Sequence, residues 1–194
     1  MTSTLERQLT DVGALKEGHF LLASGLHSDR YIEKFDLLRN PGATSAMLRT
    51  LAEQFRYQHI DVVAGPTTGG ILLAFELARQ LGVASAYAER ATDGASERTF
   101  KRGTIFTPGS RILVIDDILT TGGSIRETLA ALSSEPVEVV AVAVMVDRSG
   151  GKVAFPGVPL VPLLRMNVET WKPEDCPLCA AGIPLVKPGS TAVS

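Results

Sequence analysis

The stretch Arg111–Ser124 (RILVIDDILTTGGS) holds the clearest indications of fold and chemistry in this chain. Its apolar first half, Arg111–Ile115, predicts a buried strand, and two adjacent carboxylates, Asp116 and Asp117, follow at the strand's carboxyl end. We expect Asp116–Gly123 to form a loop that leads into a helix. A strand, a polar loop and a helix in this order are typical of α/β proteins, which bind ligands at the carboxyl ends of parallel strands.

The two halves of the expected loop suit different chemical groups. Its second half suits a phosphate, because glycines allow close backbone approach and a helix N-terminus adds N–H donors and a positive dipole. The residues concerned are Thr120, Thr121, Gly122, Gly123 and Ser124. The acidic pair would repel a phosphate unless it binds ribose hydroxyls or a cation. The stretch lacks the lysine of a P-loop, and a dinucleotide fingerprint is absent. A sugar phosphate therefore fits best, although acidic strand ends with Gly-rich turns are common in general.

Strands, loops and helices alternate along the chain from Asp61 onwards, which predicts an α/β fold with a mostly parallel central sheet flanked by helices. The expected strands are Asp61–Ala64, Val83–Ala88, Arg111–Ile115 and Val137–Val146, the last being nearly all apolar. Since the carboxyl ends of parallel strands meet at one edge, the segments that follow them should share one site. These segments are Gly65–Gly70, Asp116–Ser124 and Asp147–Gly151.

The two ends of the chain have a different character. The N-terminal part predicts a helix from near Ser3 that ends before Gly18, and then a hairpin of Phe20–Leu22 with Arg30–Lys34. A helix should begin at Pro41, with an apolar stripe formed by Met47, Leu48, Leu51, Ala52 and Phe55. The Pro- and Gly-rich tail predicts a final edge strand and a lid or arm. We expect a single domain over residues 1–194, with a core of about 40–150 and a small hood from about 1–40 and 153–194.

Ile112–Ser124 resembles the binding motif of the type I phosphoribosyltransferases, in which an apolar strand is followed by Asp-Asp, two spacers and Thr-Thr-Gly-Gly-Ser. The resemblance implies the fold of that family. It also implies that Asp116 and Asp117 hold the ribose hydroxyls of phosphoribosyl pyrophosphate and act in catalysis. Residues Thr120–Ser124 would then bind the 5-phosphate of the same substrate.

From about Gly18 to Arg148 the layout is most similar to the orotate phosphoribosyltransferase family. The resemblance lies in the Ser24-Gly25 hairpin, the loop Gly65–Gly70 and the pair Asp147-Arg148. It implies that the loop binds pyrophosphate, with Thr67, Thr68 and Gly69 as contacts. It also implies that Ser24 contacts substrate and that Arg148 grips the orotate carboxylate, which an arginine fork matches well.

The implied reaction makes orotidine 5'-monophosphate and pyrophosphate from orotate and phosphoribosyl pyrophosphate, in pyrimidine nucleotide biosynthesis. Mg²⁺ would be carried by the substrate near Asp116 and Asp117, with no fixed protein ligands. Ala23 and Leu26 depart from the family, which often has lysine and arginine there, so a purine is an alternative acceptor. His27 is either a nearby substitute or an exposed turn residue. A regulator that binds phosphoribosyl pyrophosphate without catalysis is a third possibility.

The polar segment between Arg90 and Gly103 predicts a loop or a poorly formed ribbon, and it corresponds to the family's mobile catalytic loop. Its cations are Arg90, Arg98, Lys101 and Arg102. Arg90 and Arg98 are expected to bind substrate, and either Lys101 or Arg102 to neutralise the departing pyrophosphate. In the family this loop commonly reaches into a neighbouring subunit's site, which implies a homodimer that shares residues 90–103.

Composition and charge limit the partners. The net charge of −2 and the pI of about 5.9 argue against a nucleic-acid binder. The longest apolar runs fall short of the roughly 18 residues of a membrane span, and the N-terminus lacks a signal-peptide pattern. The sequence therefore predicts a soluble, cytoplasmic protein without a membrane partner.

Cys176-Pro-Leu-Cys179 has the spacing of a zinc or iron knuckle, but a tetrahedral site needs four ligands. No second cysteine pair exists, and the histidines (His19, His27 and His59) lie far away in sequence. A dimer could pool two pairs into a Cys₄ site. Two structural thiols in a loop are the default interpretation, and a redox pair is the least favoured.

Overall fold

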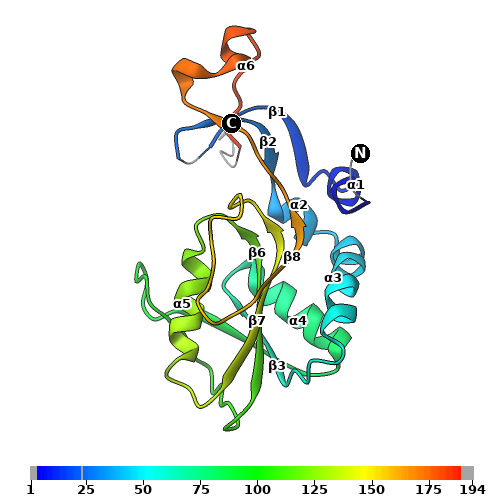
Figure 1. The fold of residues 1–194 in the computed structure, drawn as a ribbon, viewed down its shortest axis with the longest axis vertical. Helices are drawn as coiled ribbons and strands as arrows, with labels where there is room; N and C mark the ends of the chain where they lie inside the picture. Colours follow the sequence, from blue (N-terminus) through cyan, green and yellow to red (C-terminus); the bar gives the residue numbers. More distant parts are fainter. Residues whose placement is uncertain (1–3, 23, 189–194) are drawn as a thin grey trace. The chain divides into compact units, whose positions relative to one another are not determined.

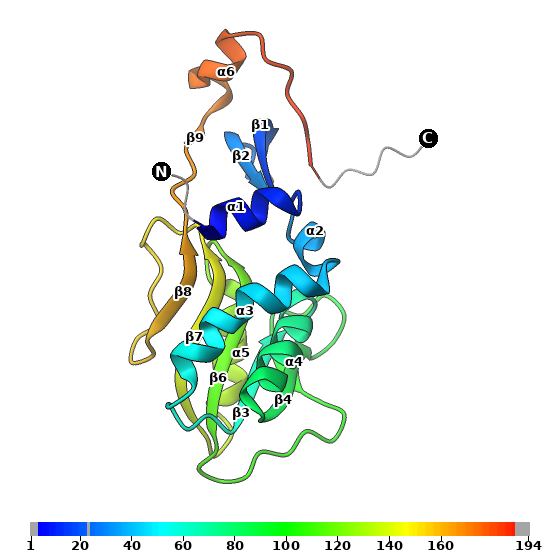
Figure 2. The same cartoon turned by 90° about the vertical axis from the view of Figure 1, so that its right-hand side faces the viewer.

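The computed structural model describes residues 4–22 and 24–188 and divides into two compact units. The larger unit is Asn40–Met166, and the smaller one combines Met1–Arg39 with Asn167–Ser194. Figures 1 and 2 show both units as ribbons. Within the described residues, no helix is both long enough and apolar enough to cross a membrane.

A six-stranded sheet forms the centre of the larger unit, with the strand order β5-β4-β3-β6-β7-β8. All neighbouring strands are parallel except β5, which is antiparallel to β4. The bounds are β3 Val62–Pro66, β4 Ala84–Arg90, β5 Arg98–Phe100, β6 Arg111–Leu119, β7 Glu138–Asp147 and β8 Leu160–Arg165. The predicted α/β class and mostly parallel sheet are confirmed, and β8 is the predicted edge strand of the tail.

Helices cover both faces of this sheet: α5 (Gly123–Leu132) lies on one face, and α3 (Pro41–Phe55) and α4 (Gly69–Leu81) lie on the other (Figures 1 and 2). The start of α3 follows from its sequence, since Pro41 occupies the first turn and the Asn40 side chain accepts a hydrogen bond from the Ala43 N–H. The predicted apolar stripe of α3 is buried, as expected for core packing. Residues 153–166, which the sequence grouped with the hood, belong to the larger unit.

The order of the strands creates one topological switch point. The chain runs outward from β3 to β4 and β5 on one side, and from β6 to β7 and β8 on the other. Because β3 and β6 are adjacent and parallel, their carboxyl ends lie side by side at this switch. In open α/β sheets this is where ligands bind.

One expectation about element bounds was wrong. The strand β6 does not stop at Ile115 but continues to Leu119, because Ile118 and Leu119 extend the ladder with β7 beyond the acidic pair. For the segment after β4 the sequence allowed a loop or a ribbon, and the structure has the ribbon, since β5 pairs with Ala88–Arg90.

The smaller unit has a three-stranded antiparallel sheet in the order β1-β2-β9. Its elements are α1 Thr4–Asp11, β1 Leu15–Leu21, β2 His27–Ile32, α2 Lys34–Leu38, β9 Thr170–Trp171, the 3₁₀ helix Pro173–Asp175 and α6 Pro177–Ala180. The predicted hairpin is present, but its second strand begins at His27 and ends before Lys34, which starts a short helix. The N-terminal helix ends at Asp11, which agrees with an end before Gly18.

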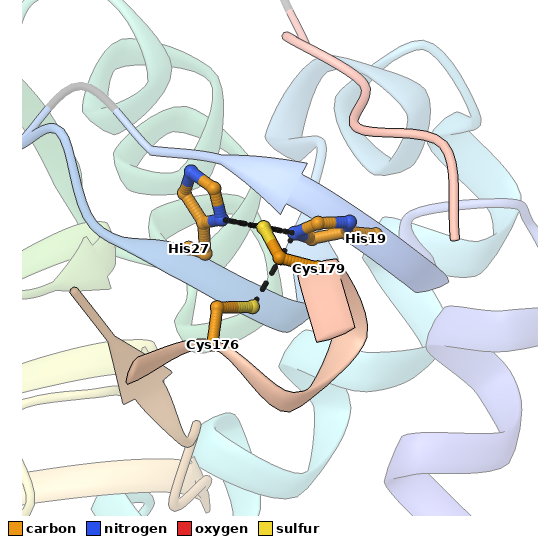
Figure 3. Close-up of side chains that lie close together, drawn as sticks. All are labelled: His19, His27, Cys176 and Cys179. Atoms are coloured by element: carbon orange, nitrogen blue, oxygen red, sulfur yellow. Dashed lines mark hydrogen bonds between the residues drawn. The ribbon is translucent and has the colours of Figure 1, made fainter. Parts of the chain in front are cut away.

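The histidines lie far from the cysteines along the chain but not in the fold. Pairing of β1 with β2, and of β2 with β9, brings His19 and His27 next to the cysteine pair (Figure 3). His27 is buried and is not an exposed turn residue.

Candidate active site

The acidic pair lies inside strand β6, and both carboxylates are buried. Asp116 accepts hydrogen bonds from the Asp117 N–H at 2.8 Å and from the Ser124 hydroxyl at 2.6 Å. One oxygen of Asp117 accepts from the Ile118 N–H at 2.7 Å. The acidic pair is therefore held by the backbone of its own strand, and Ser124 links it to the expected phosphate-binding segment.

The segment after β6 needs glycine at Gly122, which has a positive φ of 79° and precedes α5. A Cβ there would also lie 3.0 Å from both Val153 Cγ1 and the Arg126 guanidinium. The resulting turn leaves Thr120, Thr121 and Gly123 exposed beside the first turn of the helix. The N–H groups of that turn have no acceptors within the helix, so they are oriented toward an anion.

The loop after β3 is shaped by the close approach of two glycines. A Cβ on Gly65 would lie 2.2 Å from the carbonyl oxygen of Gly70, so no other residue fits there without moving the loop. The Thr67–Thr68 peptide bond is cis, and the Thr67 N–H donates to the Ala88 carbonyl at 2.9 Å. Gly69 begins α4, so this loop also ends at a helix N-terminus.

These two segments follow adjacent strands, as the sequence predicted. They stand at the switch point between β3 and β6, each leading into a helix of ten or more residues. Two helix N-termini with an acidic pair beside one of them suit a ligand that has phosphate groups at both ends and hydroxyls between them.

The ribbon that includes β5 contacts this site through Arg98, whose side chain is only 5% exposed. Its guanidinium donates to the Thr67 hydroxyl at 2.9 Å and to the Ala88 carbonyl at 3.1 Å. It also forms an ion pair with Glu127 of α5 at 3.0 Å. Arg98 thus connects the loop after β3 to the helix after β6, which is a positioning role that the sequence did not reveal.

The other ribbon cations contact the ribbon itself. Lys101 donates to the carbonyls of Arg90 and Ala91 at 2.9 and 2.8 Å, and Arg90 donates to the Ala95 carbonyl. Arg102 has a positive φ of 58° and lies 3.4 Å from a carboxylate oxygen of Glu89. Lys101 and Arg102 are exposed.

Arg148 follows β7 directly, beside the end of β6, where its N–H donates to the Leu119 carbonyl at 2.8 Å. The turn after it is held by Asp147, which accepts from the N–H and hydroxyl of Ser149 at 2.8 and 2.6 Å. Arg148 therefore stands at the same sheet edge as the acidic pair, as predicted.

The hairpin residues belong to the smaller unit. Ser24 and Gly25 lie in a turn closed by a 2.8 Å hydrogen bond from the Leu22 N–H to the Leu26 carbonyl. Gly25 has a positive φ of 82°, which suits glycine at this position. Ala23, one of the two departures from the family pattern, lies outside the described residues.

Sequence reasoning also missed what Ser124 and Glu127 do. Their spacing, Ser-x-x-Glu at the start of a helix, is that of a capping box. In the structure the N-cap is Gly122, the Ser124 hydroxyl donates to Asp116, and Glu127 pairs with Arg98. Both side chains of this pattern therefore hold site residues instead of the helix end.

The acidic pair suits Mg²⁺ only if a substrate supplies further oxygens. Both oxygens of Asp116 accept hydrogen bonds from protein groups. Among the described residues, no third carboxylate, histidine or cysteine joins the pair in a cluster that could hold a metal ion. This donor set agrees with a cation carried by substrate phosphates, since Mg²⁺ is usually bound through one or two carboxylates plus phosphate oxygens.

Comparison with known proteins defines the class. The phosphoribosyl transferase domain family matches residues 36–155, and the chain belongs to this family. A relative from Caldicellulosiruptor saccharolyticus, named orotate phosphoribosyltransferase, is 49% identical over 183 residues, which is 94% of each chain. The crystal structure of orotate phosphoribosyltransferase from Aeropyrum pernix has a TM-score of 0.71 and 31% identity, covering 84% of this chain and 94% of that one.

A third comparison shows what the fold alone does not distinguish. Adenine phosphoribosyltransferase from Thermoanaerobacter pseudethanolicus has a TM-score of 0.61 with 19% identity, covering 71% of this chain and 88% of that chain. The same fold therefore occurs in proteins named for a purine base, and the sequence similarity is what favours orotate.

Proposed function

We propose that this protein is an orotate phosphoribosyltransferase, which makes orotidine 5'-monophosphate and pyrophosphate from orotate and phosphoribosyl pyrophosphate. The observation that supports this most strongly is the 49% identity to a protein of that name over nearly the whole of both chains. The two anion-binding segments at one switch point support the same donor independently of the comparison.

We infer one orientation for phosphoribosyl pyrophosphate in the site. Residues Thr120–Ser124 bind the 5-phosphate, because they lie at the N-terminus of α5, where the first N–H groups of the helix have no acceptors within it. Asp116 and Asp117 accept hydrogen bonds from the ribose hydroxyls. The loop Gly65–Gly70 binds the pyrophosphate, and Arg98 fixes that loop through the Thr67 hydroxyl.

The reaction needs no side-chain nucleophile. A nitrogen of the base attacks the anomeric carbon through an oxocarbenium-like transition state, which inverts that centre and expels pyrophosphate. Asp116 and Asp117 favour the positive charge that develops on the sugar. Mg²⁺, held near Asp116 and Asp117 together with substrate oxygens, would stabilise the negative charge of the leaving pyrophosphate. Lys101 or Arg102 would neutralise the remaining charge once the ribbon closes and excludes water.

The acceptor is recognised by Arg148, whose planar guanidinium matches the orotate carboxylate. Its position at the end of β7, next to the end of β6, supports this role. We further propose that the protein works in the cytoplasm as a homodimer in which residues 90–103 of one subunit serve the site of the other.

A panel of bases with phosphoribosyl pyrophosphate and Mg²⁺, with pyrophosphate release as the readout, tests this function. We expect release with orotate, none with adenine, guanine or hypoxanthine, and loss of release when Mg²⁺ is chelated. Release with a purine but not with orotate would refute the acceptor. Binding of phosphoribosyl pyrophosphate without turnover of any base would instead identify a regulator.

A further inference from the structure

Four side chains in the smaller unit point toward one another from segments that lie far apart in the sequence (Figure 3). His19 comes from β1 and His27 from the start of β2, while Cys176 precedes α6 and Cys179 lies within it. One nitrogen or sulfur atom from each of the four lies within 4.8 Å of the others. His19, His27 and Cys176 are 2%, 4% and 3% exposed, so three of the four side chains are shielded from water, while Cys179 lies on the exposed side of the cluster.

Four of the six separations are close to the edges of a metal tetrahedron. His19 Nε2 lies 3.0 Å from His27 Nδ1 and 3.4 Å from Cys176 Sγ, and Cys179 Sγ lies 3.7 and 3.3 Å from the same two nitrogens. A zinc ion with Zn–N of about 2.1 Å and Zn–S of about 2.3 Å would have ligand–ligand edges of about 3.4–3.8 Å. The nitrogen–nitrogen separation is shorter than this range by a few tenths of an ångström, the His27–Cys179 separation is slightly short, and the two remaining pairs lie within 4.8 Å.

Hydrogen bonding indicates which ring nitrogen of His19 carries the hydrogen and which presents its lone pair to the cluster. Its other ring nitrogen, Nδ1, lies 2.8 Å from the carbonyl oxygen of Ile183. A carbonyl oxygen only accepts, so Nδ1 bears the hydrogen and Nε2 has the lone pair. A backbone carbonyl that orients a histidine in this way is the usual outer support of a metal-bound imidazole.

The alternative is a network of hydrogen bonds without an ion, and it satisfies these groups poorly. His19 Nε2 is an acceptor that faces His27 and both cysteines. Thiols are weak donors, and one lone pair serves one donor well. Four groups with lone pairs that converge on one point are better satisfied by a cation than by one another.

We propose that His19, His27, Cys176 and Cys179 of a single chain bind one Zn²⁺ ion in a closed Cys₂His₂ site. Soft sulfur and imidazole ligands in tetrahedral placement favour zinc over Mg²⁺. All four positions are filled by protein atoms, so the ion has a structural role and leaves no position for a substrate.

The site joins the C-terminal segment to the N-terminal hairpin, where apolar packing is weak. Ile183, Leu185 and Val186 are 42%, 44% and 52% exposed. Backbone hydrogen bonds pair Val186 with His19 and Leu21, each at 2.8 Å, and strand β9 pairs with β2, so both cysteines lie on the stretch between these two attachments. In a small unit with a small hydrophobic core, such a metal ion contributes a large share of the folding stability.

The chemistry of the thiols predicts how the site responds to acid. Zinc binds the thiolate forms and displaces their protons, so the affinity falls as the pH is lowered.

Zinc measured by elemental analysis of the full-length protein, after purification with zinc supplied, tests the proposal. We expect about one equivalent per chain in the wild type. Cys176→Ser with Cys179→Ser, and separately His19→Gln with His27→Gln, should each retain under a tenth of an equivalent. His59→Asn is the matched control and should keep full zinc, because His59 is exposed and outside the cluster, and asparagine tolerates its positive φ of 51°.

Other results would overturn the proposal. Half an equivalent per chain that survives the histidine changes would indicate cysteines pooled between two subunits. Wild-type protein with under a tenth of an equivalent would refute any tight site.

A measurement on the wild type alone avoids the risk that the variants misfold. Replacement of zinc by Co²⁺ should give the intense visible bands of tetrahedral cobalt and thiolate charge transfer, and an organomercurial should release the ion as two thiols react. A weak octahedral cobalt spectrum would contradict the ligand set.

Discussion

Asp116 contacts both strand β6 and the segment that leads into α5. Its carboxylate accepts from the next backbone N–H on one side and from the Ser124 hydroxyl on the other. A change in its orientation would therefore affect both the end of β6 and the turn that leads into α5. Asp117 is fixed by the Ile118 N–H, so the two carboxylates are oriented independently of each other.

The first residue-scale prediction concerns charge at this pair. In Asp116→Asn with Asp117→Asn, the amide oxygen can still accept from the backbone and the NH₂ group can donate to the Ser124 hydroxyl. We expect an unchanged circular dichroism spectrum and a turnover lower by about 1,000-fold, since two groups that stabilise transition-state charge lose it. Steady-state pyrophosphate release measures the effect.

The matched control is Glu53→Gln, an exposed carboxylate on α3 in the same unit, which should leave turnover unchanged. Near-wild-type turnover in the double Asp variant would mean that the pair does not bind the ribose.

At the scale of elements, the ribbon of β4 and β5 does more than carry surface charge. Through Arg98 it holds Thr67, after β3, and Glu127, on α5, with one buried guanidinium. The loop after β3 and the helix α5, for which we propose pyrophosphate and 5-phosphate binding, are therefore both contacted by one side chain. A shift of the ribbon would change both ends of the donor site together.

Arg98→Gln tests this connection. The shorter amide cannot reach both partners, so we expect the KM for phosphoribosyl pyrophosphate to rise about 10-fold and the free energy of unfolding to fall by about 2 kcal/mol, because Glu127 loses its partner. Glu127→Gln separates the two effects: it keeps the bond from Arg98 to Thr67 and should leave the KM within about twofold. Equal KM values in wild type and Arg98→Gln would show that Arg98 does not position the loop.

The elements were predictable to different degrees for physical reasons. Buried parallel strands appear as apolar runs, so β3, β4, β6 and β7 could be located from the sequence. The end of β6 could not, because Asp116 and Asp117 look like the start of a loop although the ladder with β7 continues past them. The role of Arg98 depends on three partners distant in sequence, which no local pattern encodes.

At the scale of the whole molecule, each unit depends on long-range pairing. The smaller unit is built from both ends of the chain, and the hydrogen bond between His19 and Cys176 spans 157 positions. The sequence showed the knuckle spacing of the cysteines, but it could not show that β1 and β2 supply the other two ligands. The donor site, by contrast, was predictable because its segments follow successive strands of one parallel sheet.

The last prediction concerns the sharing of residues 90–103 between subunits. Lys101 and Arg102 are exposed and contact only their own ribbon among the interactions described, which leaves their charges accessible to a second chain. If they serve the partner's site, one variant with Asp116→Asn and Asp117→Asn and another with Lys101→Ala and Arg102→Ala should each be nearly inactive alone.

A mixed dimer of these two variants, purified through two different affinity tags, would then contain one site with both sets intact. We expect roughly half of the wild-type turnover per dimer, because one of two equivalent sites is complete. If the ribbon serves its own subunit, each site of the mixed dimer lacks either the acidic pair or the ribbon cations. The turnover then stays at the level of the separate variants. A chain that elutes as a monomer at assay concentrations would exclude the shared site altogether, whatever the turnover of the mixture.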